Sequence, residues 1–509
     1  MSLAAQLTAL VGAAEPTFRG PTIDYHALAP EIVLSAAIVV LVLLDSIKLE
    51  RAKAFMPVVA NLALLGALIP LLTLAYDGGT RILFDGSYVV GPMPLLLKAM
   101  FIVSTYVVVL LSMNYVAEGD YWESEYYTLL LSSVLGMVVM ASSRDLIGIF
   151  VALELLSIPA YMLASWRKSD VRSNEAGMKY YLMGVFASAV LLYGMSLVYG
   201  IGGSTKLFEL GRAIAEAPDK GVPVVTLALL FVVVGFAFKV SAVPFHVWAP
   251  DTYEGAPTPV TAFLAVASKG AGFVALISVV FYAFLPKVNI IQPLFFVLSV
   301  ASMTVGNLVA LRQTNVVRML AYSGIAQAGF MLAPFVVAGS DPYMAMQSVV
   351  IYMVIYAAMN LGAFAVIIAI ARKTRSAELK DLAGIVHTMP GMAWCMVLFI
   401  ASLVGIPPLG GWFAKFSVFK VLIGADTGLG WATAIIMALN TAVAAYYYLN
   451  VAKTMIFDDA PDGDTTPAPR TPPALTAAVA LTLIATFVFG VLPGLLSNVT
   501  AYGPIAIGR

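Results

Sequence analysis

The sequence predicts an all-α polytopic membrane protein with about fourteen transmembrane helices. Of its 509 residues, 61% are hydrophobic and 11% are charged, and the mean hydropathy is +0.94. A soluble domain carries about 25% charged residues, so a soluble fold is excluded. A bilayer core about 30 Å thick needs about 20 apolar residues per helical span, and runs of that length recur along the whole chain.

The expected spans are approximate at their ends, and the patterns over 125–141 and 222–284 are the least marked. They cover residues 29–47, 55–76, 95–115, 125–141, 144–166, 177–201, 222–243, 257–284, 290–311, 316–338, 343–371, 390–424, 428–457 and 472–497. Segment 204–220 is expected to form a small helix, and the Asp- and Pro-rich stretch 458–473 a loop. Residues 1–14 lack the preceding charges of a signal peptide, so we expect them to begin the mature protein.

Basic residues favour a single topology. Loops after odd-numbered spans are rich in lysine and arginine: Lys48, Arg51, Lys53, Arg167, Lys168, Arg172, Arg312, Arg372, Lys373, Arg375, Lys380 and Arg470, with Lys179, Arg318 and Lys453 at loop edges. The other side holds mainly Arg81, Arg144, Lys206, Arg212, Lys220 and Lys287. The positive-inside rule places the first set in the cytoplasm and both termini on the periplasmic side.

The sequence shows no sign of several kinds of binding site. Because 28 basic residues balance 28 acidic ones, no strong overall field points to nucleic acid. The single cysteine, Cys395, excludes a thiolate cluster. His26, His246 and His387 lack metal-ligand spacing, and no glycine-rich phosphate loop follows a strand-like run. We therefore expect no metal and no redox or nucleotide cofactor in this chain.

Four ionisable residues lie deep in apolar sequence: Glu154, Lys239, Lys269 and Lys415. Each costs about 2.5–3.5 kcal/mol at a helix centre, and the default interpretation of such a residue is functional. Alternatives remain open. Lys239 and Lys415, which has Lys420 close by, could snorkel to the interface. Glu154 could be a structural counter-ion.

A short motif links two of these lysines. Gly-x-x-x-Lys-x-Ser occurs at 235–241 and again at 411–417, five expected spans apart. Because an odd number of crossings reverses direction, a five-span repeat must be inverted in the membrane. Helix breakers flank both lysines: Pro244 follows the first, and the Gly/Pro-rich 405–411 precedes the second. Inverted repeats with interrupted helices are the usual architecture of ion sites in transporters.

Lysine is suited to proton transfer in a bilayer. Desolvation penalises the ammonium form, so a buried lysine can accept and release a proton in turn, whereas arginine stays charged. The deep cations here are three lysines and no arginine. Polar residues that could carry water between them are Ser302, Thr304, Asn307, Tyr322, Ser323, Gln327, Tyr352, Tyr356 and Asn360; interhelical packing is the alternative for each.

Residues 238–263, running on to Ser268 and Lys269, closely resemble the antiporter-like membrane subunits of proton-pumping NADH:quinone oxidoreductase, respiratory complex I. The segment Ala-Pro-Asp-x-Tyr-Glu-Gly-Ala-Pro-Thr-Pro-Val-Thr is similar to subunit N in particular, as are 315–323 and 405–408. The resemblance covers roughly 125–457. One sibling subunit carries glutamate where Lys415 stands, and another has a long C-terminal lateral helix that this chain is too short to contain.

The resemblance implies fourteen helices with two inverted five-helix repeats containing interrupted helices. The expected parts are N-terminal helices in 1–124, repeats in 125–284 and 285–457, and a loop with the last helix in 458–509. By resemblance, Glu154 and Lys239 are the ion pair of the first half-channel, Lys269 is the central lysine and Lys415 ends the second half-channel. Lys179 resembles a lysine that modulates this line.

The resemblance also implies the function: proton translocation in a bacterial inner membrane, driven by redox chemistry in other subunits. NAD, FMN, Fe–S clusters and quinone are expected in those membrane and peripheral partner subunits, and lipid around this chain. The alternative within transport is a subunit of a multi-subunit Na⁺/H⁺ antiporter. A structural membrane spacer that conducts nothing is the alternative of a different class.

Overall fold

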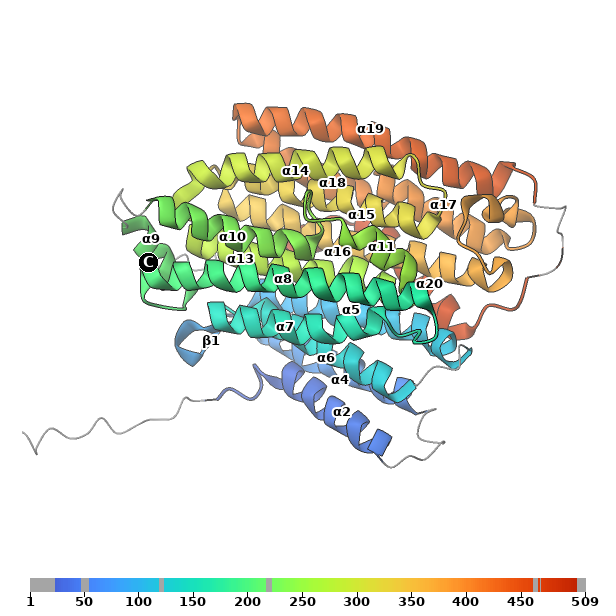
Figure 1. The fold of residues 1–509 in the computed structure, drawn as a ribbon, viewed down its shortest axis with the longest axis horizontal. Helices are drawn as coiled ribbons and strands as arrows, with labels where there is room; N and C mark the ends of the chain where they lie inside the picture. The colour runs from blue at the N-terminus through green and yellow to red at the C-terminus, as the bar shows by residue number, and fades with distance from the viewer. Residues whose placement is uncertain are drawn as a thin grey trace, which may run out of the picture.

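A computed structural model describes residues 23–46, 55–118, 123–216, 222–460, 466 and 468–500. Long helices lying side by side make up most of it (Figure 1). In hydrocarbon every backbone N–H and C=O must be satisfied within the protein, which a helix achieves within one segment. Some positions used in the sequence predictions lie outside the described residues: 1–14, Lys48, Arg51, Lys53 and Lys220.

The helices follow the predicted spans closely. They are α2 (Ala29–Ser46), α4 (Met56–Asp77), α5 (Pro92–Glu118), α6 (Glu123–Ser142), α7 (Leu146–Ala164), α8 (Val171–Gly202), α9 (Leu207–Glu216), α10 (Val222–Val240), α11 (Trp248–Gly255), α12 (Thr258–Phe263), α13 (Lys269–Val279), α14 (Val288–Ala310), α15 (Val316–Leu332), α16 (Pro342–Thr374), α17 (Pro390–Val404), α18 (Gly410–Gly424), α19 (Gly428–Phe457), α20 (Pro473–Val491) and α21 (Gly494–Thr500). The small helix expected in 204–220 is α9.

The described residues contain 12 helices that are long and apolar enough to cross a membrane. The number rises to 13 when the pair Leu379–His387 and Pro390–Val404, which is bent by 120°, is counted as one span. One of them, Thr258–Ala310, has 53 residues. That length is about 80 Å at 1.5 Å per residue, far more than one bilayer core requires. It therefore contains two predicted spans, separated by the 3₁₀ turn Leu285–Lys287. The predicted all-α polytopic fold is confirmed.

The predicted span 390–424 is interrupted. It consists of α17 and α18, each 15 residues long, and Gly405 between them has a left-handed φ of 98°. Neither half reaches the length of one crossing alone. α10 likewise ends at Val240, and irregular backbone leads from there to α11. Both breaks lie where the sequence predicted them.

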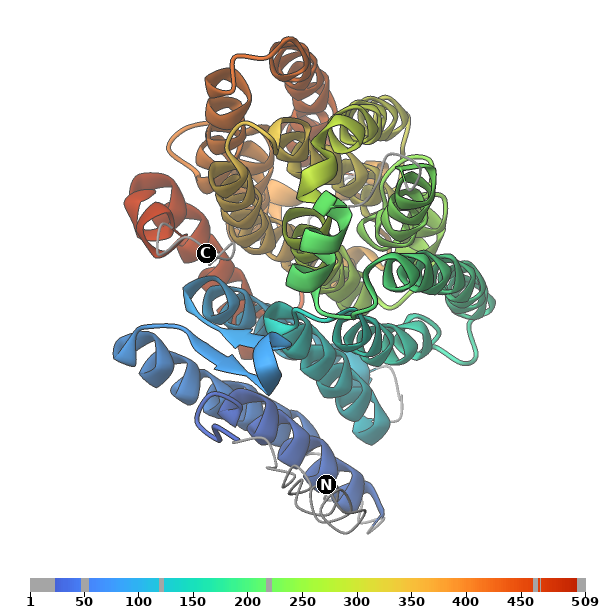
Figure 2. The ribbon, with the colours of Figure 1, turned by 90° about the vertical axis from the view of Figure 1, so that its left-hand side faces the viewer.

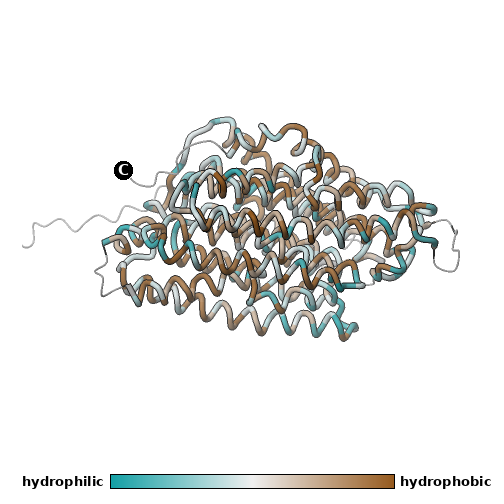
Figure 3. The backbone as a smooth tube through the Cα atoms, turned by 90° about the horizontal axis from the view of Figure 1, so that it is seen from above, coloured by the Kyte–Doolittle hydropathy of each residue, from teal (hydrophilic) through white to brown (hydrophobic). Residues whose placement is uncertain are grey.

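Side-chain hydropathy is banded across the bundle. Figure 3 shows hydrophilic residues gathered at its two ends and apolar residues between them. Large apolar side chains such as Leu72, Phe186 and Leu439 stand 70%, 72% and 64% exposed on the chain's outer faces. A soluble protein rarely exposes such extensive apolar surface. The arrangement fits a bundle whose flanks face lipid.

The two ends of the bundle differ. One end, called here the hairpin end, carries α9 and an antiparallel hairpin of β1 (Arg81–Leu83) and β2 (Tyr88–Val90) (Figures 1 and 2). The opposite end, called here the basic-loop end, carries loops 165–170 and 375–389 (Figure 1). The separation agrees with the single topology predicted from charge.

The core surrounds α16, whose central residues 345–370 are almost all buried. α16 contacts α5, α12, α15, α17, α18 and α20, whereas α2 and α4 lie at one edge of the bundle (Figure 2). The predicted division at 284 coincides with the end of a π-helical segment and that at 457 with the end of α19. The division at 124 falls in the first turn of α6. These divisions stay predictions.

Candidate functional site

Lys239 lies at the C-terminal end of α10, just before the helix breaks, and is only 4% exposed. Its Nζ donates to Ser157 Oγ at 2.8 Å and to Tyr180 OH at 3.2 Å. These acceptors belong to α7 and α8, so three helices enclose the ammonium group. Because the side chain is buried and its hydrogen bonds are made inside the bundle, snorkelling to the interface is not what positions it.

Glu154 lies on α7 one turn before Ser157 and accepts a hydrogen bond from Ser188 Oγ of α8 at 2.6 Å. Among the described residues, no ion pair within 4.0 Å joins Glu154 to Lys239. Instead, both border the same helix junction, where Ser157, Ser188 and Lys239 line a cavity with room for about one water molecule. Their ion-pair role stays a prediction.

Lys269 begins α13, directly after a π-helical segment, Leu264–Ser268. It is 1% exposed, and its Nζ donates to the backbone oxygen of Gly324 on α15 at 2.9 Å. A Cβ at Gly324 would lie 3.1 Å from that Nζ, so glycine leaves room for the lysine. Single-turn π segments occur frequently at functional sites. Tyr356 joins Lys269 in lining a second cavity with room for about one water.

Lys415 lies in the first turn and a half of α18 and is 5% exposed. Its Nζ donates to the oxygen of Val404, the last residue of α17, at 2.8 Å and lies 5.0 Å from the centre of the Phe330 ring. A helix C-terminus and an aromatic face both attract a cation. The nearby Lys420 is exposed, so the two lysines do not share an environment.

Polar side chains connect the surroundings of Lys269 and Lys415. Gln327 lies one turn beyond Gly324 on α15, and its Nε2 donates to Leu403 O and Tyr448 OH, each at 3.4 Å. Tyr352 OH donates to Gln327 Oε1, and Ser323 is hydrogen-bonded to Tyr448. Leu403 is adjacent to Val404, which holds Lys415. The predicted positions Ser323, Gln327 and Tyr352 therefore come together between the two lysines.

Other polar residues predicted from sequence make contacts outside the group between Lys269 and Lys415. Ser302 Oγ accepts from Val243 N at 2.9 Å and so supports the break after α10. Asn307 bonds to Asn440 and Tyr447 on α19. These contacts join helices, as interhelical packing would require. Asn360 is fully buried, and neither amide atom of its side chain has a hydrogen-bond partner within the described part of the chain.

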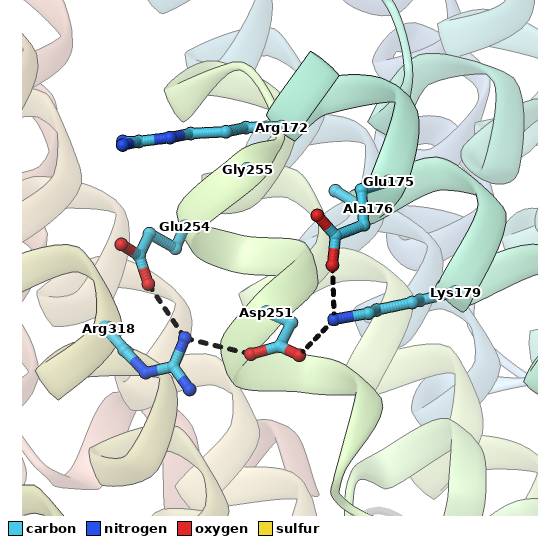
Figure 4. A pocket seen from close by; sticks show the side chains of 8 residues that line it. All are labelled: Arg172, Glu175, Ala176, Lys179, Asp251, Glu254, Gly255 and Arg318. Atoms are coloured by element: carbon cyan, nitrogen blue, oxygen red, sulfur yellow. Dashed lines mark hydrogen bonds and ion pairs between the residues drawn. The ribbon is translucent and has the colours of Figure 1, made fainter.

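Lys179 does not lie in the buried line. Its side chain is 41% exposed and pairs with Asp251 and Glu175, both at 2.7 Å (Figure 4). Arg318 bonds to Asp251 at 2.9 Å and Glu254 at 2.8 Å. With Arg172 these residues line an open depression at the basic-loop end, called here the ion-pair bowl (Arg172, Glu175, Lys179, Asp251, Glu254 and Arg318).

Electrostatics in the bowl favour the charged state of Asp251. Partial burial alone would raise the pKa of its carboxyl group, but hydrogen bonds and positive charge from Lys179 and Arg318 outweigh burial and lower that pKa from its usual value. The bowl also shares elements with the Lys239 site. Lys179 is followed by Tyr180, whose ring stacks on Trp248 of α11 with centroids 4.4 Å apart.

Two partners of Lys239, Ser157 and Tyr180, and one residue of the polar group between Lys269 and Lys415, Tyr448, were not singled out from sequence. Ser157 stands three residues after Glu154, a spacing that places both on one face of a helix and could have revealed it. Tyr180 adjoins Lys179, and Tyr448 lies in a run of three tyrosines on α19. No sequence signal assigns either tyrosine to a lysine site, because the contact depends on how α8 and α19 pack.

Several known proteins are similar to this chain over most of its length. Residues 143–441 match the family described as NADH:quinone oxidoreductase/Mrp antiporter, TM. NADH-quinone oxidoreductase subunit N 2 of Solibacter usitatus is 43% identical over 81% of this chain and 82% of its own length. Subunit N of Moorella thermoacetica is 39% identical over 93% of this chain and 97% of its own length.

Two solved structures are similar to this chain over most of its length. A chain of respiratory complex I from Thermus thermophilus is 31% identical, with a TM-score of 0.77, covering 93% of this chain and 100% of that one. A chain of the Mrp complex from Dietzia sp. DQ12-45-1b shares the fold at 19% identity, with a TM-score of 0.82 over 94% of this chain and 96% of that one.

Proposed function

The chain belongs to the NADH:quinone oxidoreductase/Mrp antiporter membrane family, and we propose that it is a proton-translocating subunit N of an NADH:quinone oxidoreductase. The observation that carries the proposal is the set of three lysines, Lys239, Lys269 and Lys415, each at most 5% exposed inside an apolar bundle. Subunit N of other organisms matches most of the chain and supplies the assignment within the family.

The partners of the three lysines suit reversible protonation. Each Nζ donates to a hydroxyl or a backbone oxygen, and no carboxylate among the described residues lies within 4.0 Å of it. A carboxylate would favour the ammonium form. A hydroxyl can accept from an ammonium and donate to an amine, so Ser157 and Tyr180 can serve Lys239 in both states.

Protons would pass between these lysines through water and polar side chains. Gln327, Tyr352 and Tyr448 supply hydrogen-bonding groups between Lys269 and Lys415, and the cavities at Lys239 and Lys269 have room for about one water each. Glu154 would act on Lys239 as a nearby negative charge whose distance sets how firmly the ammonium is held. Lys179, in the bowl, would modulate the first half-channel from outside.

The energy source and the setting are part of the proposal. The described residues offer no cluster of metal-binding side chains. We place NAD, FMN, Fe–S clusters and quinone in partner membrane and peripheral subunits. Under this proposal the chain is a subunit of the translocase that carries out no redox chemistry itself. By the positive-inside rule the basic-loop end faces the cytoplasm, and the hairpin end and both termini face the periplasm of a bacterial inner membrane.

The test uses the assembled complex in proteoliposomes, with NADH oxidation and proton uptake measured together. Lys269→Met removes the titratable group, and Lys269→Arg keeps the charge but cannot release its proton. We expect both, and Lys239→Ala, to lose most proton uptake. Lys420→Met, an exposed lysine of α18, is the control and should pump as the unaltered protein does. Normal pumping by assembled Lys269→Met and Lys239→Ala complexes would reject the assignment.

The same vesicles distinguish the second candidate, a Na⁺/H⁺ antiporter subunit, which the shared fold of the Mrp chain makes reasonable. An antiporter would exchange protons against an imposed Na⁺ gradient without NADH. We expect proton movement with NADH and none with the Na⁺ gradient alone. Exchange driven by Na⁺ alone would replace the proposed function with this one.

A further inference from the structure

A second group of buried charges lies at the hairpin end, outside the line of lysines. Lys98 of α5 is 0% exposed and donates to Glu31 Oε1 of α2 at 2.6 Å. Tyr88 of β2 donates to the same oxygen at 2.5 Å and lies 3.2 Å from Lys98 Nζ. The acid comes from α2, and the base and the phenol come from the later stretch formed by β2 and α5, so two segments far apart in sequence bring these groups together in the protein interior.

Arg144 completes this group, and its backbone fixes it beside the hairpin. Its N–H donates to Ser87 O at 2.8 Å, and the neighbouring Ser143 pairs with Tyr88. Its side chain donates to Ser143 O at 2.8 Å, and the residue as a whole is 9% exposed. Arg144 acts electrostatically on both Tyr88 and Lys98. We call Glu31, Tyr88, Lys98 and Arg144 the hairpin-end cluster.

Two features distinguish this cluster from a simple structural ion pair. Glu31 Oε2 is buried and has no hydrogen-bond partner among the residues that the structure describes, so the carboxylate retains an unused acceptor there. With Lys98 and Arg144 both charged and Glu31 ionised, the cluster carries one net positive charge in low dielectric. Arginine cannot release a proton. Loss of one proton from Lys98 would make the cluster neutral and still leave an amine to bond with Glu31.

The cluster adjoins the helix that carries Lys269 from two sides. Arg144 lies 3.5 Å from Ser278 Oγ and over the ring of Tyr282, with 4.9 Å to its centre. Ser278 is nine residues beyond Lys269, or about 13.5 Å along a helix. On the other side, α5 touches Gly270 through Met100, two residues from Lys98. Met100 also lines the Lys269 cavity.

We propose that the hairpin-end cluster is a further proton-binding site, through which protons pass between the Lys269 region and water at the hairpin end. This inference rests on the proposed function. In one cycle the Lys98 ammonium gives its proton to water beneath the hairpin, leaving a neutral amine beside ionised Glu31. The amine then takes a proton delivered from Lys269 through intervening water, which restores the ammonium.

The charged and titratable groups that act on Lys98 come from three neighbouring segments. They are Glu31 of α2, Tyr88 of β2 and Arg144 of the α6–α7 link, while Tyr282 of the π-helical segment Val280–Phe284 faces Arg144. The alternative is that Glu31 and Lys98 only tie α2 to α5. In that case a neutral pair of similar shape should substitute without loss, because replacing both partners of a buried ion pair is often tolerated.

The experiment compares the double variant E31Q/K98M with unaltered protein in the assembled complex, measuring proton uptake per NADH oxidised. The proposal predicts assembly with proton uptake lowered about tenfold or more, as for loss of an acid–base group. Arg81→Gln is the control, because Arg81 pairs with Asp24 and Asp77 at the same end but on the surface. Normal uptake by assembled E31Q/K98M overturns the proposal.

A milder variant tests the proposal even where the double variant does not assemble. Tyr88→Phe keeps the ring and removes one hydrogen bond to a charged group, so we expect uptake to fall about tenfold and its pH profile to shift. Unchanged uptake and pH profile overturn the proposal. Lys269→Met, measured in parallel, separates the two hypotheses: if it pumps normally the proposed function fails, whereas loss in Lys269→Met with normal E31Q/K98M and Tyr88→Phe rejects this site alone.

Discussion

The break that positions Lys415 depends on a close backbone approach at Gly411. A Cβ at this position would lie 1.7 Å from the carbonyl oxygen of Ser402 and 2.7 Å from its carbonyl carbon. Gly411 N also donates to Ser402 Oγ at 3.0 Å. Because the obstructing atoms belong to the backbone of α17, no side-chain rotation relieves the overlap. Gly411→Ala must therefore move α18 away from α17.

The size of the effect follows from two opposed terms. Overpacking of a dense interior costs about 1–3 kcal/mol, and a clash with backbone belongs at the upper end of that range. Alanine returns about 0.5–1 kcal/mol relative to glycine within a helix. We expect a net loss of about 2 kcal/mol and a displaced Lys415, whose bond to Val404 O crosses the same break.

The assay is thermal loss of the chain from the purified assembled complex, together with proton uptake in vesicles. Gly424→Ala in the last position of α18 is the matched control, since no heavy atom lies within 4 Å of its added Cβ. The control should be unchanged or stabilised by about 0.4–1 kcal/mol. Equal thermal midpoints and equal pumping for the two alanine variants would refute the close approach of α17 and α18.

Two further predictions concern the bowl and the core. Asp251→Asn should destabilise the chain by about 0.4–2 kcal/mol at neutral pH, a value kept small because both ion pairs, to Lys179 and Arg318, are about a third exposed. Since the folded-state pKa of Asp251 is lowered, this stability is present above about pH 4 and is lost as pH falls further; a difference in thermal midpoint that persists undiminished in acid would contradict it. Asn360→Leu should retain or raise thermal stability, because neither amide atom has a partner among the residues described. It should also slow proton uptake about tenfold, because leucine cannot hold a water that conducts; unchanged uptake would remove Asn360 from the path.

The buried lysines were predictable because desolvation makes them costly. A lysine such as Lys269, with apolar sequence on both sides, has no route to water along its own helix, so sequence alone places it in the interior. The helix breaks near Lys239 and Lys415 were predictable for a similar reason, since proline and clustered glycines cannot continue a helix without loss. Both predictions depend on local sequence only.

Glu31 and Lys98 were not predictable in this way. Glu31 stands in the first turn of α2, where an acidic residue ordinarily complements the helix N-terminus. Lys98 stands near the start of α5, where a lysine ordinarily reaches the interface. Their burial arises because the hairpin folds back over the helix ends and places Tyr88 against both. Only the tertiary arrangement reveals the pair.

The partners of each lysine, more than its depth, distinguish the roles proposed for these lysines. Lys179 is bound by two carboxylates in the bowl, which favours a permanent ammonium. Among the described residues, Lys239 and Lys269 have only neutral acceptors, and no carboxylate within 4.0 Å opposes release of a proton. Lys98 is intermediate, because Arg144 counters part of the effect of the Glu31 charge on it. The proposed proton path thus uses lysines whose partners are neutral, or whose carboxylate partner is balanced in part by another cation, whereas Lys179 supplies a fixed charge in the bowl.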